Sequence, residues 1–212
     1  MTSPARILAT MDAVTYVVQR GIPGALVECG VWRGGSVLAM IRTLQKAGVD
    51  DRAIYLFDTF EGMTRPSERD TSTFDLPALQ TWTASESAGR IPWEWAFDPD
   101  LFNFDDVRSL ILGSGYPVDQ VHFVRGRVED TLPGAAPEPI AVLRLDTDWY
   151  ESTWHELVHL YPRVAKAGIL IIDDYGHWDG CRKAVDQYFD EVETPVFLAR
   201  SDYTGRIAMK LT

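Results

Sequence analysis

Short runs of apolar residues alternate along this chain with segments of helical periodicity, and this alternation limits the folds open to it. The apolar runs fall at 25–29, 54–58, 121–124, 140–145 and 169–172, each bounded by polar residues, glycine or proline. The helical segments fall at 36–46, 105–112, 153–166 and 181–191. Alternating strands and helices predict an α/β fold, in which helices cover both faces of a parallel sheet.

The two ends of the chain depart from this alternation. Residues 1–20 carry an N-terminal amphipathic helix, whose apolar stripe suits packing on the domain and a subunit contact equally, so a homo-oligomer stays possible. Near the other end, the runs 196–200 and 206–211 are joined by the short segment 201–205, which leaves no room for a helix. These last two runs therefore predict an antiparallel hairpin.

The segment 61–103 interrupts the pattern with prolines and aromatic residues. Its aromatic residues, with the one that follows it, are Phe74, Trp82, Trp93, Trp95, Phe97, Phe102 and Phe104. A long connection of this composition inside a domain is typical of a lid or insert over an active site. A cover for a sheet edge would suit the same residues equally well.

Length and charge narrow the class of protein. A chain of 212 residues predicts a single domain, 1–212, and its formal charge of −11 opposes binding to nucleic acid or to anionic membranes. The chain begins without a basic, apolar leader, has no long apolar run, and contains two cysteines, Cys29 and Cys181. We therefore expect a cytoplasmic protein with reduced thiols and no membrane span.

The first apolar run ends in a glycine-rich turn, VECGVWRGGS at 27–36. Glycines there allow a tight bend and close approach of a ligand beside the positive end of the next helix. The spacing is not that of a dinucleotide site, and Glu28 would repel a pyrophosphate but attract a cationic amino group. The turn indicates a nucleotide that carries an amino acid, with a plain tight turn as the alternative. Asp58 ends the second run, where it can accept both hydroxyls of a ribose or cap a turn.

Acidic residues follow the fourth and fifth apolar runs. Asp146 and Asp148 come after the fourth run, and Asp173 and Asp174 come after the fifth. Because parallel strands share a carboxyl edge, these side chains should meet in one crevice. We expect no matching lysine or arginine beside them, which favours a hard divalent cation such as Mg²⁺ over solvated loop acids. His177 could face the same crevice as a base or a substrate donor.

At these residues the chain resembles the TylF/MycF family of macrocin-type O-methyltransferases, which are metal-dependent and use S-adenosylmethionine (SAM). Beside the glycine-rich turn, the resemblance is carried by LFDTFEGM at 56–63, VRGRVEDTLP at 124–133, LRLDTDWYEST at 143–153 and LIIDDYGHWDGCRKAVDQY at 170–188. It implies the class I SAM-methyltransferase (Rossmann-like) fold. In that fold, a seven-stranded, mostly parallel sheet closes with an antiparallel C-terminal hairpin.

The resemblance also implies a role for each matched residue. It places Glu28, Gly30 and Ser36 beside SAM, with Asp58 on the ribose hydroxyls. It assigns Asp146, Asp173 and Asp174 to Mg²⁺ or another divalent cation. Asp148, together with Asp146, would then be catalytic, and Asp148 would be the general base.

These expectations combine into one functional hypothesis. The protein would transfer a methyl group from SAM to a small-molecule acceptor with adjacent hydroxyls, such as a sugar on a glycosylated natural product. One alternative is a non-catalytic SAM- or nucleoside-binding module, which has no need for four acids at the strand ends. A second is an NAD-linked oxidoreductase, which the missing G-x-G-x-x-G spacing weakens.

Overall fold

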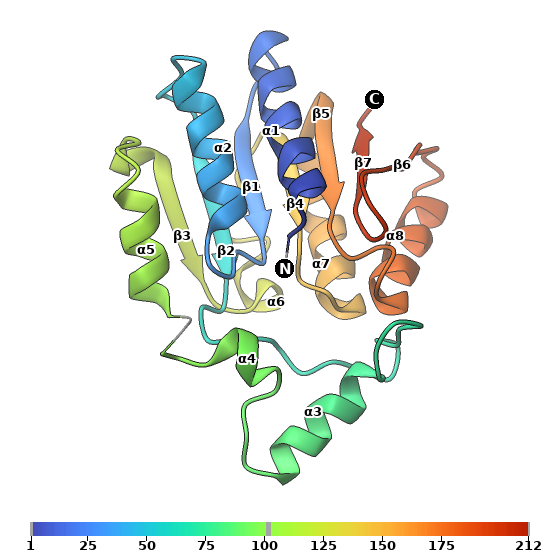
Figure 1. The fold of residues 1–212 in the computed structure, drawn as a ribbon. Helices are drawn as coiled ribbons and strands as arrows, with labels where there is room; N and C mark the ends of the chain where they lie inside the picture. Colours follow the sequence, from blue (N-terminus) through green and yellow to red (C-terminus); the bar gives the residue numbers. More distant parts are fainter. Residues whose placement is uncertain (1, 101–102, 212) are drawn as a thin grey trace.

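A seven-stranded sheet runs through the centre of the computed structural model, which describes residues 2–100 and 103–211 (Figure 1). The strand order is β3-β2-β1-β4-β5-β7-β6. The strands are β1 (Ala25–Cys29), β2 (Ile54–Asp58), β3 (Val121–Arg125), β4 (Ile140–Leu145), β5 (Val164–Ile172), β6 (Ala199–Arg200) and β7 (Arg206–Met209). Strands β1 to β5 pair in parallel, and β7 pairs antiparallel with both β5 and β6. The predicted parallel sheet and closing hairpin are therefore confirmed.

Helices cover both faces of this sheet (Figure 1). One face carries α1 (Pro4–Gln19), α2 (Gly35–Lys46) and α5 (Phe104–Leu112), and the other carries α6 (Val128–Thr131), α7 (Tyr150–Leu160) and α8 (Asp179–Glu191). Short 3-10 helices, η1 (Val118–Gln120) and η2 (Tyr161–Arg163), precede β3 and β5. Two further helices, α3 (Ala78–Ser87) and α4 (Glu94–Phe97), lie beyond the carboxyl ends of the parallel strands.

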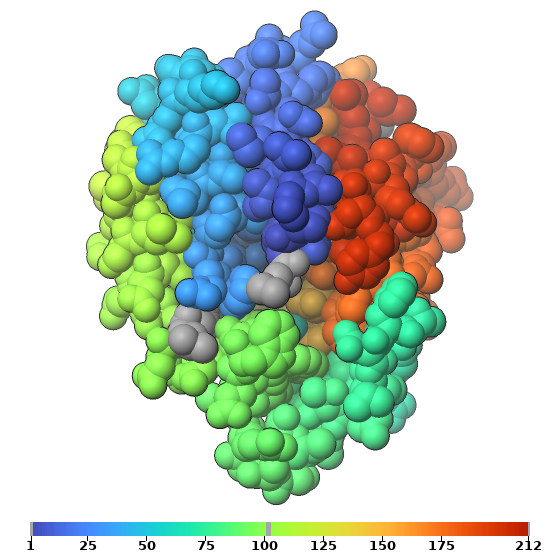
Figure 2. Space-filling model, viewed as in Figure 1, coloured from blue at the N-terminus to red at the C-terminus, as the bar shows by residue number. Residues whose placement is uncertain are grey.

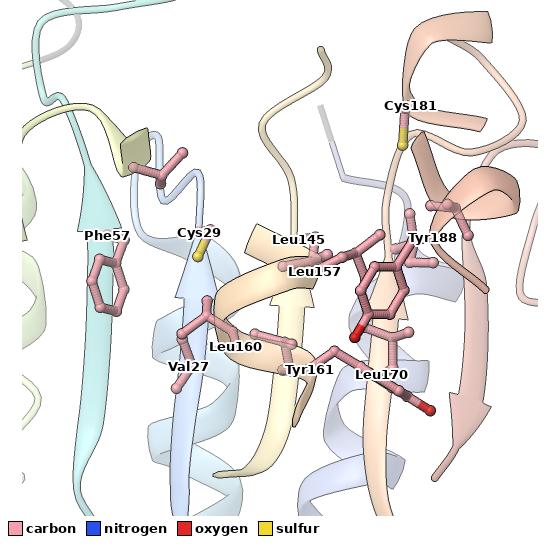
Figure 3. Close-up of a cluster of buried hydrophobic side chains, with 14 of the residues drawn as sticks. Val27, Cys29, Phe57, Leu145, Leu157, Leu160, Tyr161, Leu170, Cys181 and Tyr188 are labelled. Carbon is pink, nitrogen blue, oxygen red and sulfur yellow. The ribbon is translucent and has the colours of Figure 1, made fainter. Parts of the chain in front are cut away.

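The helices α7 and α8 bury their apolar faces against one side of the sheet. Figure 3 shows Leu157, Leu160 and Tyr188 from these helices beside Val27, Leu145 and Leu170 from the strands. Burying one such side chain contributes roughly 1.5–3 kcal/mol, so this layer contributes to the stability of the sheet. Both cysteines, Cys29 and Cys181, are buried and free, as expected for reduced thiols.

The opposite face is covered by α2 and α1. Val37, Met40, Ile41 and Leu44 recur at helical spacing along α2, and all four are fully buried. The apolar stripe of α1 is buried in the same cluster through Ala13, Val14 and Val17. The stripe therefore packs on the domain, and the homo-oligomer stays a prediction.

One helix ends earlier than its sequence pattern predicted. The helical segment expected at 153–166 stops at Leu160, and η2 follows with Pro162 in its centre. Residues 164–166 open β5 instead, where Val164 aligns with Ile140 of β4. Proline prevents the helix from continuing, and pairing with a central strand outweighs the local helical periodicity.

The segment 61–103 folds over the carboxyl edge of the sheet and contains α3 and α4, two helices that no periodicity predicted. Ala78 is the buried residue of α3, so this helix has little apolar face to detect. Residues 101 and 102, and with them Phe102, lie outside the described residues. In the described chain, no helix has the length and apolar character needed to cross a membrane.

Candidate active site

A cavity of about 530 Å³ lies at the carboxyl edge of the sheet, under the segment 61–103. The predicted site residues among its lining are Gly30, Asp58, Asp146, Asp148, Asp173, Asp174 and His177. Aromatic residues of the lining include Trp32, Trp93, Trp95, Trp149 and Trp178. Parallel strands end at the same edge, so residues far apart in the sequence meet here, as open α/β sheets generally arrange their ligand sites.

The glycine-rich turn after β1 needs glycine at position 30. Gly30 has φ +80°, and a Cβ there would lie 1.9 Å from the carbonyl oxygen of Asp146. The end of β1 can therefore approach the end of β4 because residue 30 has no side chain. This contact brings the turn and the acidic residues to one cavity.

Asp58, at the end of β2, holds the same turn from its other side. One carboxylate oxygen accepts the backbone N–H groups of Val31 at 2.6 Å and Trp32 at 2.9 Å. The other oxygen accepts the N–H of Phe60 at 2.7 Å. Burial raises the pKa of Asp58, while these backbone donors oppose the shift. Asp58 thus organises the turn while its carboxylate also lines the cavity.

Glu28 and Ser36 are not among the residues that line the cavity. Glu28 is buried, and the cation that it meets in this structure is the guanidinium of Arg144 in β4. Burial raises the pKa of Glu28 to about 7, although Arg144 lowers it, and Oε2 of Glu28 has no hydrogen-bond partner among the described residues. Ser36 is buried in the first turn of α2.

Two arginines lie against the acidic residues, and neither contact was predicted from the sequence. Arg144 is fully buried; its Nη1 lies 2.6 Å from Asp146 Oδ2, and its Nη2 donates to Asp173. Arg6, from α1, donates to the other oxygen of Asp173 and lies 3.0 Å from Asp202. The expectation that the acids lack matching cations was therefore wrong. The signal for Arg144 was its place inside an apolar strand, since a buried charge needs a partner.

Asp146, Asp173 and Asp174 form a compact set of possible metal ligands. One carboxylate oxygen from each lies within 4.8 Å of the other two. Burial, with Asp148 and Asp146 nearby, raises the pKa of Asp174, while Arg6 and Arg144 oppose this shift. A cluster of oxygen donors with negative charge to neutralise has the chemistry that a hard divalent cation requires, so the residues fit such an ion.

Asp148 and His177 lie beside this set in different settings. Asp148 has φ 66°, and its Oδ1 accepts the indole N–H of Trp178 at 2.9 Å. Burial and the charge of Asp146 raise the pKa of Asp148 to about 7. His177 contacts Asp75 through Nε2 at 3.0 Å and Tyr203 through Nδ1 at 3.1 Å. Both nitrogens of His177 are thus engaged by neighbouring side chains, while Asp148 faces the cavity beside the acidic set.

The base of the segment 61–103 is tied to the start of α7 by a buried acid. Asp70 accepts the N–H of Tyr150 at 2.8 Å and the N–H of Ser67 at 2.7 Å. The indole of Trp149 donates to the carbonyl of Thr64 at 2.9 Å. No motif pointed to Asp70, because its role appears only when the segment is folded onto α7. These bonds hold the wall of the cavity beside Asp148.

The strand order, the closing hairpin and the position of the cavity define the class I SAM-methyltransferase fold. Among solved structures, the O-methyltransferase NovP superposes with a TM-score of 0.81 at 30% identity, covering 98% of this chain and 80% of that one. The calicheamicin methyltransferase CalS11 superposes with a TM-score of 0.65 at 19% identity, covering 98% and 80% respectively, which supports the fold.

Sequence comparison gives the family. The model of the macrocin-O-methyltransferase (TylF) family matches residues 1–91 and 102–208, and the chain belongs to that family. It is 35% identical over 177 residues to demethyldecarbamoylnovobiocin O-methyltransferase of Streptomyces niveus, covering 84% of this chain and 62% of the relative. It is 38% identical over 185 residues to the 8-demethyl-8-(2,3-dimethoxy-alpha-L-rhamnosyl)-tetracenomycin-C 4'-O-methyltransferase of Streptomyces olivaceus, covering 85% of this chain and 65% of the relative. The chain thus spans less than two thirds of these two relatives.

Proposed function

We propose that this protein is a SAM-dependent O-methyltransferase that requires a divalent cation, with Mg²⁺ as the favoured ion. The observation that carries the proposal is a single cavity that joins the glycine-rich turn and Asp58 to the set Asp146, Asp173 and Asp174. Membership of the TylF family supports the same activity. The acceptor would be a small molecule with adjacent hydroxyls.

A sugar hydroxyl of a glycosylated natural product is the acceptor that we favour. The Streptomyces olivaceus relative is named for a rhamnosyl-bearing tetracenomycin, which supports this choice. The tryptophans in the cavity wall would suit it as well, because aromatic rings pack against apolar faces and exclude water. Their π-faces would also favour a sulfonium cation.

The cofactor end of the cavity would be formed by Gly30 and Asp58. The Asp58 carboxylate accepts three backbone N–H groups, and a carboxylate offers about four lone-pair sites. The Thr59 hydroxyl lies 3.5 Å from Oδ1 of Asp58 but only 2.7 Å from the carbonyl of Gly62, so Asp58 can still accept a ribose hydroxyl when Thr59 donates to Gly62. Glu28 and Ser36 lie outside the cavity lining, so we propose no direct contact with the cofactor for them. SAM would supply the methyl group for an in-line displacement that yields a methyl ether and S-adenosylhomocysteine.

The acceptor end would be formed by the acidic residues. Asp146, Asp173 and Asp174 would hold the cation, and Arg144 fixes the first two of them from inside the sheet. A bound divalent cation lowers the pKa of a coordinated hydroxyl and fixes its orientation.

Asp148 would accept the proton of the reacting hydroxyl. Trp178 fixes one oxygen of Asp148, and the carboxylate lines the cavity beside the acidic set, where it can take a proton from a bound acceptor. The contacts of His177 with Asp75 and Tyr203 favour Asp148 over His177 in this role.

Calorimetric titration with SAM and S-adenosylhomocysteine, with and without Mg²⁺, tests the cofactor part of the proposal. We expect micromolar binding that is retained by Asp146→Asn, while Asp146→Asn abolishes methyl transfer to glycosylated acceptors with vicinal hydroxyls. Asp190→Asn, which changes an exposed acid of α8, is the matched control and should behave like the wild type.

The same titrations distinguish the alternatives. Absence of SAM binding under every condition would refute the methyltransferase assignment. Binding of SAM without Mg²⁺ binding and without turnover would instead favour the non-catalytic module. Loss of SAM binding in Asp146→Asn would show that this residue belongs to the cofactor end of the cavity.

A further inference from the structure

Arg6 connects the first helix to the acidic site from across the molecule. Its side chain is buried, and it contacts Asp173 at the end of β5 as well as Asp202 before β7. Figure 2 shows the start of α1 lying against the C-terminal part of the chain, and the contacts of Arg6 fall at this junction. Thr2 and Arg6 both line the cavity. Thr2 and the first turn of α1 thus form part of the cavity wall.

The surroundings of Arg6 hold it in place. Asp202 accepts the hydroxyl of Ser3 at 2.6 Å and the backbone N–H of Gly205 at 2.7 Å, so the carboxylate that receives Arg6 is itself fixed. A Cβ on Gly205 would lie 3.0 Å from Cγ and Cδ of Arg6, so glycine leaves room for the arginine side chain. Holding the guanidinium in one place lowers the entropic cost of its contact with Asp173.

Asp173 therefore carries a guanidinium on each carboxylate oxygen. Arg144 donates to Oδ1, and Arg6 donates to Oδ2. The two arginines differ in origin: Arg144 projects from the strand β4, whereas Arg6 comes from a helix that contacts the site through its first turns. A divalent cation that binds an oxygen of Asp173 would lie beside a guanidinium that is already bound to that carboxylate. Like charges that share one ligand repel each other.

We infer that Arg6 is a resident counter-cation of the acidic site, which stabilises the metal-free protein and competes with the divalent cation for Asp173. This inference rests on the metal dependence proposed above. Arg6 then sets the metal affinity as a positioning residue, without taking part in the transfer of the methyl group. Because linkage is reciprocal, binding of the cation weakens the contact between Arg6 and Asp173 and loosens the start of α1.

The test is the Mg²⁺ affinity of Arg6→Gln, measured by calorimetry in the absence of SAM and acceptor. Glutamine keeps a hydrogen-bond donor near Asp173 but removes the charge. We expect Mg²⁺ to bind at least about tenfold more tightly to Arg6→Gln than to the wild type, since a unit charge beside a metal ligand acts strongly even under solvent screening. Arg6→Lys, which keeps the charge, should stay close to the wild type. Arg20→Gln, at the exposed far end of α1, is the matched control.

An unchanged or weaker Mg²⁺ affinity in Arg6→Gln would overturn the inference while leaving the metal-dependent function intact. Absence of Mg²⁺ binding in both proteins would overturn the inference together with the metal part of the proposed function, whereas the SAM titration would still report on the cofactor part.

A second measurement uses the unmodified protein and does not depend on the folding of a variant. Hydrogen exchange of the amides in residues 5–10 should become faster when Mg²⁺ saturates the site, because the Arg6 contact is weakened. Exchange that is slower or unchanged on saturation with Mg²⁺ would contradict the competition.

Discussion

The buried pair of Glu28 and Arg144 makes the stability of this protein depend on pH. Glu28 is enclosed beneath the glycine-rich turn, and burial raises its pKa from an ordinary 4.5 to about 7, with Arg144 opposing and Asp146 adding to the shift. The folded protein then binds a proton at Glu28 more tightly than the unfolded chain does. The resulting stabilisation is fully present below pH 4.5 and is lost as the pH rises through about 7.

The size of this effect follows from the shift. A difference of about 2.5 pKa units corresponds to roughly 3 kcal/mol in all, of which about 2 to 3 kcal/mol falls between pH 5 and pH 8. Glu28→Gln has the same shape but does not titrate. The free energy of unfolding of Glu28→Gln should therefore rise relative to the wild type by that amount between pH 5 and pH 8, whatever constant offset the amide adds.

Urea unfolding at several pH values, with EDTA present to remove divalent cations, measures this difference. Glu61→Gln is the matched control, because Glu61 is exposed and paired with Arg125 on the surface, and its difference from the wild type should not vary over this range. If the difference between Glu28→Gln and the wild type is equally constant, Arg144 compensates for the burial completely and the reasoning is refuted.

Three further substitutions test how the cavity is built. Gly30→Ala should destabilise the protein by about 3 kcal/mol or more in chemical unfolding, because its Cβ would meet the Asp146 carbonyl at a positive φ; near-wild-type stability would contradict this close approach. Asp58→Ala should weaken SAM binding at least about tenfold in calorimetry through the loss of the turn and of the ribose acceptor, and an unchanged affinity would exclude both roles. Asp70→Ala should lower the melting temperature by roughly 6 to 12 °C, since about 3 kcal/mol is lost when buried donors lose their acceptor, whereas a shift below 2 °C would show that the base of the segment 61–103 is held by other contacts.

The central strands β1 and β4 could be predicted because they are buried along their whole length and are therefore mostly apolar in sequence. The end of α7 was predicted less well, because residues 164–166 follow the helical period while their pairing with β4 is a long-range contact. The helix α3 was not predicted for a different reason, because only Ala78 of its residues is buried. Periodicity reports burial, so an element with little burial gives no signal.

The site residues also divide into those that a local pattern predicts and those that depend on long-range contacts. The position of Asp58, Asp146 and Asp173 could be predicted because each ends or directly follows a strand, and the carboxyl edge of a parallel sheet collects such residues. Asp70 and Arg6 could not be predicted, since each acts through a contact with an element far away in the sequence. Asp70 accepts a hydrogen bond from the start of α7, and Arg6 donates to Asp173, which lies 167 positions further along the sequence.

The two arginines neutralise part of the negative charge in the acidic set, but they do not contact all of its carboxylates. Arg144 contacts both Asp146 and Asp173, and Arg6 contacts Asp173 as well, so these two acids are largely compensated. Asp174 instead receives the neutral N–H of Asp148 at 3.3 Å, and burial beside Asp148 and Asp146 raises its pKa. Asp148 likewise accepts a neutral N–H, from Trp178, so the acids held by neutral donors in place of a guanidinium lie at the Asp148 end of the cluster. A cation bound there would lie next to the proposed base, which is where an acceptor hydroxyl must sit if one ion is to bind it and one carboxylate is to take its proton.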